Sequence, residues 1–253
     1  GGFFALNSCT APTNEKDYSV FVNPFIGTGG HGHTFPGAVV PHGMIQPSPD
    51  TRIDGWDACS GYYYEDSTIN GFSHTHVSGT GCCDYGDVLL MPTVGEQRYQ
   101  TTDPQSQQLA YSSAFSHENE TAEPGYYSVF LDTYQVKAEI SATKRGAIHR
   151  YTFPESSEAG FILDLDYSLQ RQTNSDMGIE VISDTEICGH KETTYWAFDQ
   201  YINFYAKFSK PFSYTLIADS ITMDDGKRLP ICKALLHFET KKDEQVLVKT
   251  GIS

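Results

Sequence analysis

The sequence predicts an all-β protein, built as a large antiparallel β-sandwich. From residue 86 onward, many short segments alternate apolar and polar side chains, which is the period of a strand with one buried face. Turn-forming residues separate these segments, and no window keeps the 3.6-residue period of a helix. The 16 tyrosines and 15 phenylalanines also favour strands over helices.

The elements follow from this pattern in chain order. Residues 18–26 are predicted as a short strand broken by Pro24. Residues 27–87 are rich in Gly, Pro, Asp, Ser and Thr and are predicted to form loops; so long an irregular stretch usually marks a functional surface. The strands predicted after it are 86–94, 126–131, 135–142, 147–153, 160–167, 178–183, 201–208, 213–218, 233–239 and 244–251. The CGHK string at 188–191 is interpreted as a turn.

Alternation also predicts which side chains face the core. In YYSVFL, Tyr127, Val129 and Leu131 fall on one side of the strand, and that side is predicted to be buried. In QVKAEISA the same argument selects Val136, Ala138, Ile140 and Ala142. The packing of many such faces predicts two large sheets.

The 253-residue chain is long enough to bury a core without disulfide bonds. Its formal net charge of -15 repels phosphate backbones, which argues against nucleic-acid binding and suits a neutral or cationic ligand. Simple solubility explains the same charge equally well. No apolar run approaches the length of a membrane span.

Residues 1–17 are interpreted as a signal remnant and linker ahead of one domain at 18–253. The string LNSC at 6–9 matches the end of a bacterial lipoprotein signal, in which Cys9 would carry the lipid. A chance match of four residues is the alternative. A lipid on Cys9 would make the protein an exported one, attached to a membrane only through that anchor.

The remaining cysteines are irregularly spaced and contain no CxxC pair, so a zinc knuckle is not expected. Cys82 and Cys83 are adjacent and alternate faces in an extended chain, so only one can point inward.

Three loop segments combine glycine with His, Asp and Trp: GGHGHTFPGAVVPHG at 29–43, SPDTRIDGWDACSGYYYED at 48–66 and GFSHTHVSGTGCCDYGD at 71–87. The pairs His31–His33 and His74–His76, with Asp54, Asp57 or Asp84, have a composition that a zinc or iron site uses. The HxH spacing is only weakly specific, and histidines in glycine-rich loops more often hydrogen-bond backbone groups or ligand hydroxyls.

Trp56 lies between Gly55 and Asp57 and is followed by three tyrosines at 62–64. An exposed indole covers the C–H face of a pyranose, while neighbouring carboxylates accept hydroxyl protons. A buried tryptophan in the core is the alternative, because large aromatic side chains are usually buried. The flanking glycine and carboxylates favour exposure and a sugar site, with Gly30 giving close approach of the backbone.

Long strings of the chain resemble the N-terminal part of glycoside hydrolase family 92. They are VNPFIGTGGHGHTFPGA at 22–38, GMIQPSPDTR at 43–52, GWDACSGYYYED at 55–66, GFSHTHVSGTGCCDYGDVLLMPT at 71–93, FSHENETAEPGYYSVFL at 115–131, TKRGAIHRYTFP at 143–154 and FYAKFSKPF at 204–212. The resemblance departs at His42, where the family often has Phe, and at residues 82–85.

The resemblance implies a calcium-dependent, exo-acting, inverting α-mannosidase of the α-1,2 type. It implies an N-terminal β-sandwich of the galactose-mutarotase-like supersandwich type, paired with a C-terminal (α/α)6 barrel. The general acid, the general base and most calcium ligands are expected on that barrel, so neither a catalytic residue nor a metal ligand is expected in this chain. Asp57, Asp84 and Glu118 have the carboxyl group that proton transfer needs, but nothing else around them in the sequence indicates that role.

The substrate-binding residues expected in this chain are Gly30, His31, His33, Trp56, Asp57, His74 and His76. The expected partners are α-mannosides of the N-glycan or mannan type and the barrel domain, in a protein of the bacterial periplasm or outer-membrane surface. The fragment alone is expected to be inactive. A stand-alone carbohydrate-binding module and a purely structural domain remain as alternatives.

Overall fold

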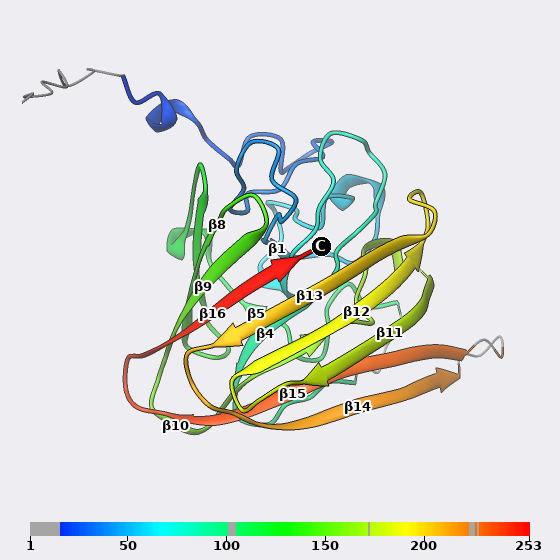
Figure 1. The fold of residues 1–253 in the computed structure, drawn as a ribbon. Coiled ribbons are helices and arrows are strands. Elements are labelled where there is room, and N and C mark those ends of the chain that lie inside the picture. Colours follow the sequence, from blue (N-terminus) through cyan, green and yellow to red (C-terminus); the bar gives the residue numbers. More distant parts are fainter. Residues whose placement is uncertain (1–15, 101–104, 172, 223–225, 227) are drawn as a thin grey trace, which may run out of the picture.

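The computed structural model describes residues 16–100, 105–171, 173–222, 226 and 228–253. Two antiparallel sheets pack face to face, and long loops gather at one end of the sandwich (Figure 1). The predicted all-β sandwich with two large sheets is confirmed. Among the described residues there is no helix with the length and apolar character needed to cross a membrane.

The larger sheet has eight strands in the order β11-β12-β13-β16-β9-β8-β7-β6. Their bounds are β11 Thr173–Val181, β12 Glu186–Thr194, β13 Gln200–Phe208, β16 Glu244–Ile252, β9 Gly146–Phe153, β8 Val136–Ala142, β7 Tyr126–Leu131 and β6 Glu120–Glu123. Neighbours along the chain pair as hairpins, except where β16 is inserted between β13 and β9. The outer face of this sheet is turned toward the viewer in Figure 1.

The smaller sheet has six strands in the order β1-β3-β4-β10-β15-β14. Their bounds are β1 Ser48–Asp50, β3 Gly71–Ser73, β4 Leu89–Val94, β10 Ser156–Asp164, β15 Arg228–Thr240 and β14 Ser213–Thr222. A two-stranded sheet joins β2 Thr68–Ile69 to β5 Ser113–Ala114. The short 3-10 helices are η1 Ser19–Phe21, η2 Trp56–Ala58, η3 His117–Asn119 and η4 Leu169–Arg171.

The core lies between the two sheets and is rich in aromatic rings. Tyr151 of β9 and Phe161 of β10 face each other across it, with ring centroids 5.0 Å apart in an edge-on arrangement. Burial of each such ring stabilises the fold by about 1.5–3 kcal/mol. Tyr127, Val129 and Leu131 are fully buried, as the alternation predicts.

Two local predictions are wrong. Residues 18–26 form helix η1 and turns instead of a strand, and Val20 and Phe21 are exposed, so these apolar side chains have no sheet to join. The CGHK string at 188–191 lies inside strand β12 instead of forming a turn. Gly189 pairs there with Ile179 and Phe204, and a Cβ at this position would lie 2.6 Å from the Phe204 ring.

Candidate functional site

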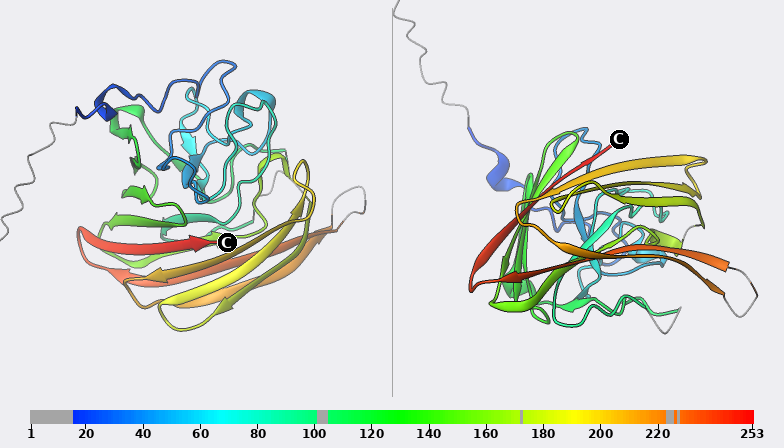
Figure 2. Two further views of the ribbon diagram at one scale, coloured as in Figure 1. Left: turned by 45° about the horizontal axis from the view of Figure 1, so that its top comes forward. Right: turned by 60° about the horizontal axis from the view of Figure 1, so that its bottom comes forward.

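Three loop segments, 27–38, 51–66 and 71–87, gather at the end of the sandwich seen uppermost in the left view of Figure 2. The first is a tight loop in which Thr34 N donates to Gly27 O at 3.3 Å. A Cβ on Gly32 would lie 2.0 Å from that same carbonyl oxygen, so only glycine allows the chain to cross itself there. This crossing places His31 and His33 on the side of the loop that faces Trp56.

Trp56 is the centre of an exposed patch formed by the first and second loops. Its side chain is 57% exposed, so the predicted exposure is confirmed. The ring of His33 meets it edge-on at 4.5 Å between centroids, and the ring of His31 lies 5.2 Å away. Nδ1 of His31 lies 2.6 Å from Oδ1 of Asp57. We call His31, His33, Trp56 and Asp57 the tryptophan patch.

The third loop closes one side of this patch. Gly81, with φ +65°, approaches so closely that a Cβ would lie 3.0 Å from Nε1 of Trp56 and 3.1 Å from Cε1 of His33. Gly79 N donates to His33 O at 2.5 Å, which fastens the third loop to the first. Nε2 of His33 is buried and has no hydrogen-bond partner among the described residues. Because this nitrogen is covered from solvent, a ligand hydroxyl does not reach it in the geometry described.

Two cysteines lie beneath the patch. Cys83 is buried, its Sγ donates to Gly55 O at 3.4 Å, and Cys82 is only partly buried, so only one of the pair points inward as predicted. Burial raises the pKa of the Cys83 thiol to about 12 and also raises the pKa of Cys59. These thiols therefore stay protonated and pack as small apolar side chains. Cys9 lies outside the described residues.

His76 lies below the surface, in contrast to the expected sugar contact. Its Nε2 is 2.7 Å from Oδ1 of Asp50 and its Nδ1 is 2.7 Å from Gln46 O, with both side chains of the His76–Asp50 pair fully buried. Ser73 Oγ lies 3.1 Å from Nε2. With both nitrogens occupied, His76 holds β1 against the third loop and has no atom free for a sugar.

His74 is buried as well, in a chain of hydrogen bonds through the core. Its Nδ1 lies 2.6 Å from Val88 O, and its Nε2 lies 3.2 Å from Nε2 of His149. Nδ1 of His149 lies 3.0 Å from the hydroxyl of Tyr151. Burial lowers the pKa of His74 to about 4 and holds the pKa of His149 well below its usual range, so both rings are neutral.

The third loop is also tied to the hairpin between β12 and β13. Asp84 Oδ2 accepts from Ala197 N at 2.9 Å, and Asp87 Oδ2 accepts from Gln200 at 2.8 Å. Lys191 of β12 is buried, with its Nζ 3.1 Å from Oδ1 of Asp87. The sequence gives no sign of this buried lysine, because its position was assigned to a turn.

A second cluster lies under the second loop. Glu120 is buried and accepts from the hydroxyls of Tyr62 at 3.0 Å and Tyr127 at 2.6 Å, and it lies 2.6 Å from Nδ1 of His117. His117 stacks on Tyr64 with centroids 4.2 Å apart. In this segment the sequence offers Glu118 as a candidate carboxylate, to which no proton transfer is assigned. Glu118 is exposed on η3, and the buried, hydrogen-bonded carboxylate of the segment is that of Glu120.

The structure therefore places the seven predicted substrate-binding residues in two groups, one at the surface and one buried. It brings His31, His33, Trp56 and Asp57 together, with Gly30 exposed at the tip of the first loop. It places His74 and His76 beneath them. The two HxH pairs do not meet, and across the part of the chain that is described no group of three or more His, Cys, Asp or Glu residues could hold a metal ion.

Comparison with known proteins agrees with this architecture. The family model described as the glycosyl hydrolase family 92 N-terminal domain matches residues 21–253. The family GH92 alpha-mannosidase BT3965 from Bacteroides thetaiotaomicron, solved in complex with mannoimidazole, superposes with a TM-score of 0.84 and 37% identity, over 93% of this chain and 32% of that chain. The family GH92 inverting mannosidase BT2199 from the same species gives 0.72 and 27%, over 92% of this chain and 31% of that one.

A curated relative, an uncharacterized secreted glycosidase of Arthroderma benhamiae, is 31% identical over 156 residues, which are 60% of this chain and 19% of the relative. The chain thus spans about a third of the length of the solved structures it matches, 32% in the case of BT3965. The family match covers the whole sandwich and all three loop segments. The chain belongs to glycosyl hydrolase family 92 and corresponds to that family's N-terminal domain.

Proposed function

We propose that the tryptophan patch lines the substrate pocket of a calcium-dependent, exo-acting α-mannosidase whose catalytic residues lie outside residues 1–253. The observation that carries the proposal is the convergence of His31, His33, Trp56 and Asp57 from two loops onto one exposed surface. Membership of family 92 and the likeness to structures described as mannosidases support mannose as the sugar.

Each member of the patch suits part of a sugar. The exposed indole of Trp56 packs against the C–H face of a pyranose. Asp57 accepts hydroxyl protons, and a carboxylate accepts stronger hydrogen bonds than a neutral group does. His33 packs edge-on against the indole and supports it, and Gly30 leaves the tip of the first loop free of side chains. We do not assign a sugar contact to His74 or His76, because both are buried.

Proton transfer falls to the rest of the protein. An inverting glycosidase needs two carboxyl groups roughly 6.5–9.5 Å apart on opposite faces of the sugar. In this chain Asp57 is engaged with His31, Asp84 accepts from Ala197 N, and Glu118 lies exposed on η3. The inverting mechanism named for BT2199 supports the same stereochemistry here. We place the general acid and base on a C-terminal (α/α)6 barrel.

Like proton transfer, calcium binding is assigned to the rest of the protein. The described residues do not by themselves provide a group of carboxylates that fits the ion. We therefore place the calcium ligands on the barrel. No residue of this chain is given a step that depends on the ion.

The secreted curated relative supports an exported protein. We place this protein at the periplasm or outer surface of a bacterium. An acyl chain on Cys9 would anchor it there. The mass of the native protein extracted from membranes tests this anchor, and an unmodified Cys9 would exclude it.

The test of function uses the full-length protein that contains residues 1–253. We expect release of mannose from α-linked mannobioses, fastest from the α-1,2 isomer, with loss of activity on chelation and recovery on adding Ca²⁺. Proton NMR of the first turnover should show β-mannose. A full-length protein that leaves the α-1,2, α-1,3 and α-1,6 isomers intact would contradict the proposal, as would turnover by residues 1–253 alone.

Replacement of Trp56 separates a substrate-binding domain from one that only supports the barrel. In the full-length protein we expect Trp56→Ala to raise KM about tenfold, since an aromatic stacking contact contributes about 0.5–1.5 kcal/mol beyond its buried area. Tyr214→Ala is the control, because Tyr214 is also an exposed aromatic residue but lies on β14 of the smaller sheet. Unchanged kinetics for Trp56→Ala would favour the purely structural role.

A further inference from the structure

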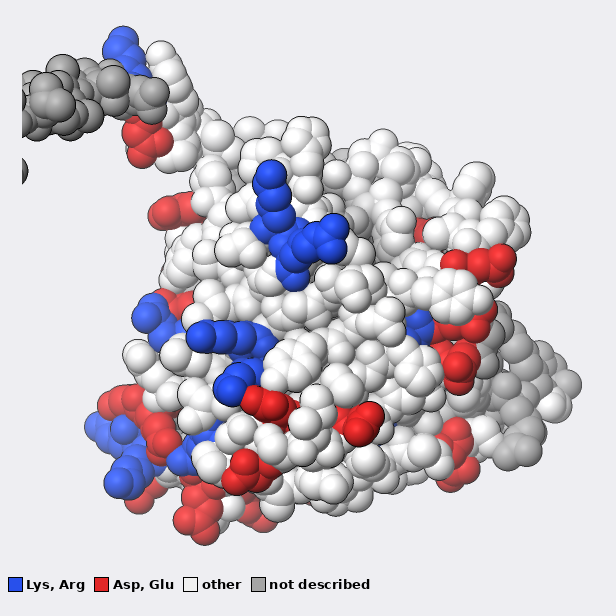
Figure 3. Space-filling model, viewed as in Figure 1, with Lys and Arg blue, Asp and Glu red and all other residues white. Residues whose placement is uncertain are grey.

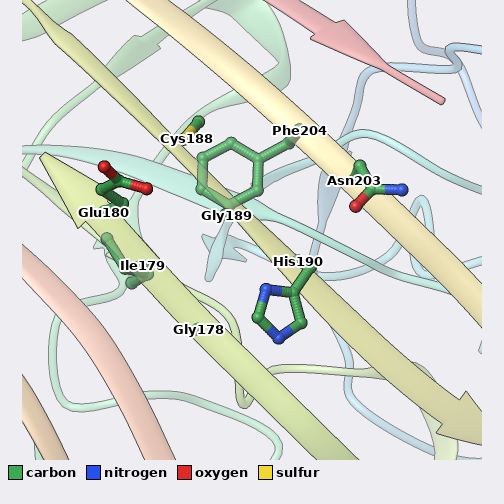
Figure 4. A pocket seen from close by; sticks show the side chains of 8 residues that line it. All are labelled: Gly178, Ile179, Glu180, Cys188, Gly189, His190, Asn203 and Phe204. Atoms are coloured by element: carbon green, nitrogen blue, oxygen red, sulfur yellow. The ribbon is translucent and has the colours of Figure 1, made fainter. Parts of the chain in front are cut away.

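A shallow depression of about 410 Å³ lies on the larger sheet, away from the tryptophan patch. Figure 4 labels the eight residues that line it: Gly178, Ile179 and Glu180 of β11, Cys188, Gly189 and His190 of β12, and Asn203 and Phe204 of β13. These three strands form the edge of the sheet farthest from β6. The function proposed above makes no use of them.

The register of the strands explains the depression. Three cross-strand rows run through it: Gly178–His190–Asn203, then Ile179–Gly189–Phe204, then Glu180–Cys188–Tyr205. The middle row turns its side chains toward the core, where Phe204 is buried, so it presents only backbone to the outside. The two flanking rows point outward and form the walls.

Glycine deepens the depression. Gly178 lies in an outward-facing row but has no side chain, and the ring of His190 lies over it. A Cβ on Gly178 would lie 2.7 Å from Cε1 of that ring. Nε2 of His190 lies 3.3 Å from Oδ2 of Asp176, so its neighbour on β11 also restrains the ring.

Two exposed tyrosines extend the surface along β13. Tyr201 is 63% exposed and Tyr205 is 41% exposed, and they flank Asn203 on the same side of the strand. A hydrogen bond to Glu192 raises the pKa of Tyr201, and one to Glu186 raises the pKa of Tyr205, so each ring is held by a residue of β12. The exposed residues Trp196 and Phe198 lie on the hairpin between β12 and β13, which is bonded to the third loop.

The chemistry of this surface selects its ligand. No lysine or arginine lines the depression, and Glu180 faces it, so an anion would be repelled. Figure 3 shows mostly uncharged side chains over this part of the face, with both acidic and basic groups around them. An amide, an imidazole and a carboxylate supply donors and acceptors, whereas an apolar partner helix would leave them unpaired. Exposed tyrosine rings beside such groups suit the alternating C–H and hydroxyl faces of a sugar chain.

We propose that the outer face of β11, β12 and β13 is an accessory binding surface for an uncharged glycan chain, distinct from the tryptophan patch. The choice of an α-mannan as the ligand rests on the function proposed above, whereas the surface itself does not. Binding there would hold a polymer on the enzyme while the chain end reaches the pocket loops along the aromatic side chains of the hairpin.

The test measures retention of the full-length protein in native gels that contain yeast α-mannan. All variants carry Trp56→Ala, so that binding at the tryptophan patch contributes little. We expect Tyr205→Ala to weaken retention at least about fivefold, Tyr201→Ala/Tyr205→Ala to weaken it further, and Tyr205→Phe to keep most of it. Ile148→Ala is the matched control, because Ile148 is 40% exposed on the outer face of β9 in the same sheet.

In the protein with native Trp56, Tyr205→Ala should leave kcat/KM on α-1,2-mannobiose unchanged, since this disaccharide is too short to span both sites. Retention equal to that of the parent in both tyrosine variants would overturn the proposal. So would a lower melting temperature without loss of retention, which would mean that the rest of the polypeptide covers this face. The full-length protein could instead cleave no mannoside but bind a neutral glucan or galactan in a Tyr205-dependent way. That result would support the accessory surface and contradict the proposed mannosidase activity.

Discussion

Nδ1 of His31 lies 2.6 Å from Oδ1 of Asp57, and this contact joins two loops that are 26 residues apart in the chain. The imidazole is 78% exposed and the carboxylate 40% exposed, so solvent screens the pair and its contribution to stability is small. Its effect is local: it holds the carboxylate against His31, whose ring packs beside Trp56. A pair of this kind should affect binding more than folding.

We predict that Asp57→Asn in the full-length protein lowers kcat/KM on α-mannosides about tenfold, mainly through KM, because a charged acceptor is lost. The melting temperature should stay close to that of the wild type. Glu96→Gln is the control, since it removes another exposed ion pair, with Arg98, away from the site. A large fall in melting temperature for Asp57→Asn, with unchanged KM, would contradict the assignment.

Gly81 and Gly79 offer a sharper test of the geometry around Trp56. Both have positive φ, +65° and +78°, so alanine strains the backbone at each by about 1 kcal/mol. Only at Gly81 would the new Cβ meet the Trp56 and His33 rings; at Gly79 there is nothing within 4 Å. We predict that Gly81→Ala shifts tryptophan fluorescence and raises KM about tenfold or more, whereas Gly79→Ala does neither. Equal effects from both substitutions would show that strain alone is responsible.

The strands that the sequence predicts best are those whose inward positions are all apolar. In β7 these are Tyr127, Val129 and Leu131, and all three are fully buried. Strand β12 escaped prediction because its inward positions are Ile187, Gly189, Lys191 and Thr193, of which only one is a large apolar residue. The buried ammonium of Lys191 pairs with Asp87, more than a hundred positions earlier in the chain. An alternating pattern of apolar and polar residues does not reveal a partner so far away in the sequence.

Prediction of the candidate site is limited in the same way, by partners that are distant in the sequence. The three loop segments could be selected from composition, because glycine, histidine and aspartate seldom gather without a function. The two HxH pairs could not be told apart, because they read alike in the sequence. Their difference lies in distant partners: Asp50 is 26 positions from His76, and His149 is 75 positions from His74.

The buried pair of His76 and Asp50 should be a stability determinant. His76→Leu would leave the Asp50 carboxylate without its partner in a site that excludes water, which costs about 3–5 kcal/mol. We predict a fall in melting temperature of at least several degrees, partly reversed by Asp50→Asn in the same protein. His237→Leu, at an exposed position of β15, should change little. If His76→Leu melts like the wild type, the pair does not hold the loops as described.

The chain of Tyr151, His149 and His74 predicts how stability depends on pH. The neutral tautomers that satisfy every bond have Tyr151 donating to His149 Nδ1, His149 Nε2–H donating to His74 Nε2, and His74 Nδ1–H donating to Val88 O. A proton on His74 would put two N–H groups against each other, and a proton on His149 would put Nδ1–H against the Tyr151 hydroxyl, in both cases in a buried site. Both histidines therefore bind protons more weakly in the folded state than in the unfolded state.

Because the folded pKa of His74 is about 4 and the unfolded value is about 6.5, the unfolded chain takes up more protons between these pH values. The contribution of this pair is fully present above pH 6.5 and is lost as the pH falls toward 4, by up to about 1.4 kcal/mol per pH unit for each ring. Burial beside Asp164 raises the pKa of Asp166, which acts in the opposite direction, so variants must isolate the histidine effect. We predict that His149→Gln, which can still bond to His74 but cannot titrate, flattens the melting temperature between pH 4 and 6.5, whereas His237→Gln leaves its slope unchanged. Parallel curves for His149→Gln and the wild type would mean that these rings titrate alike in both states.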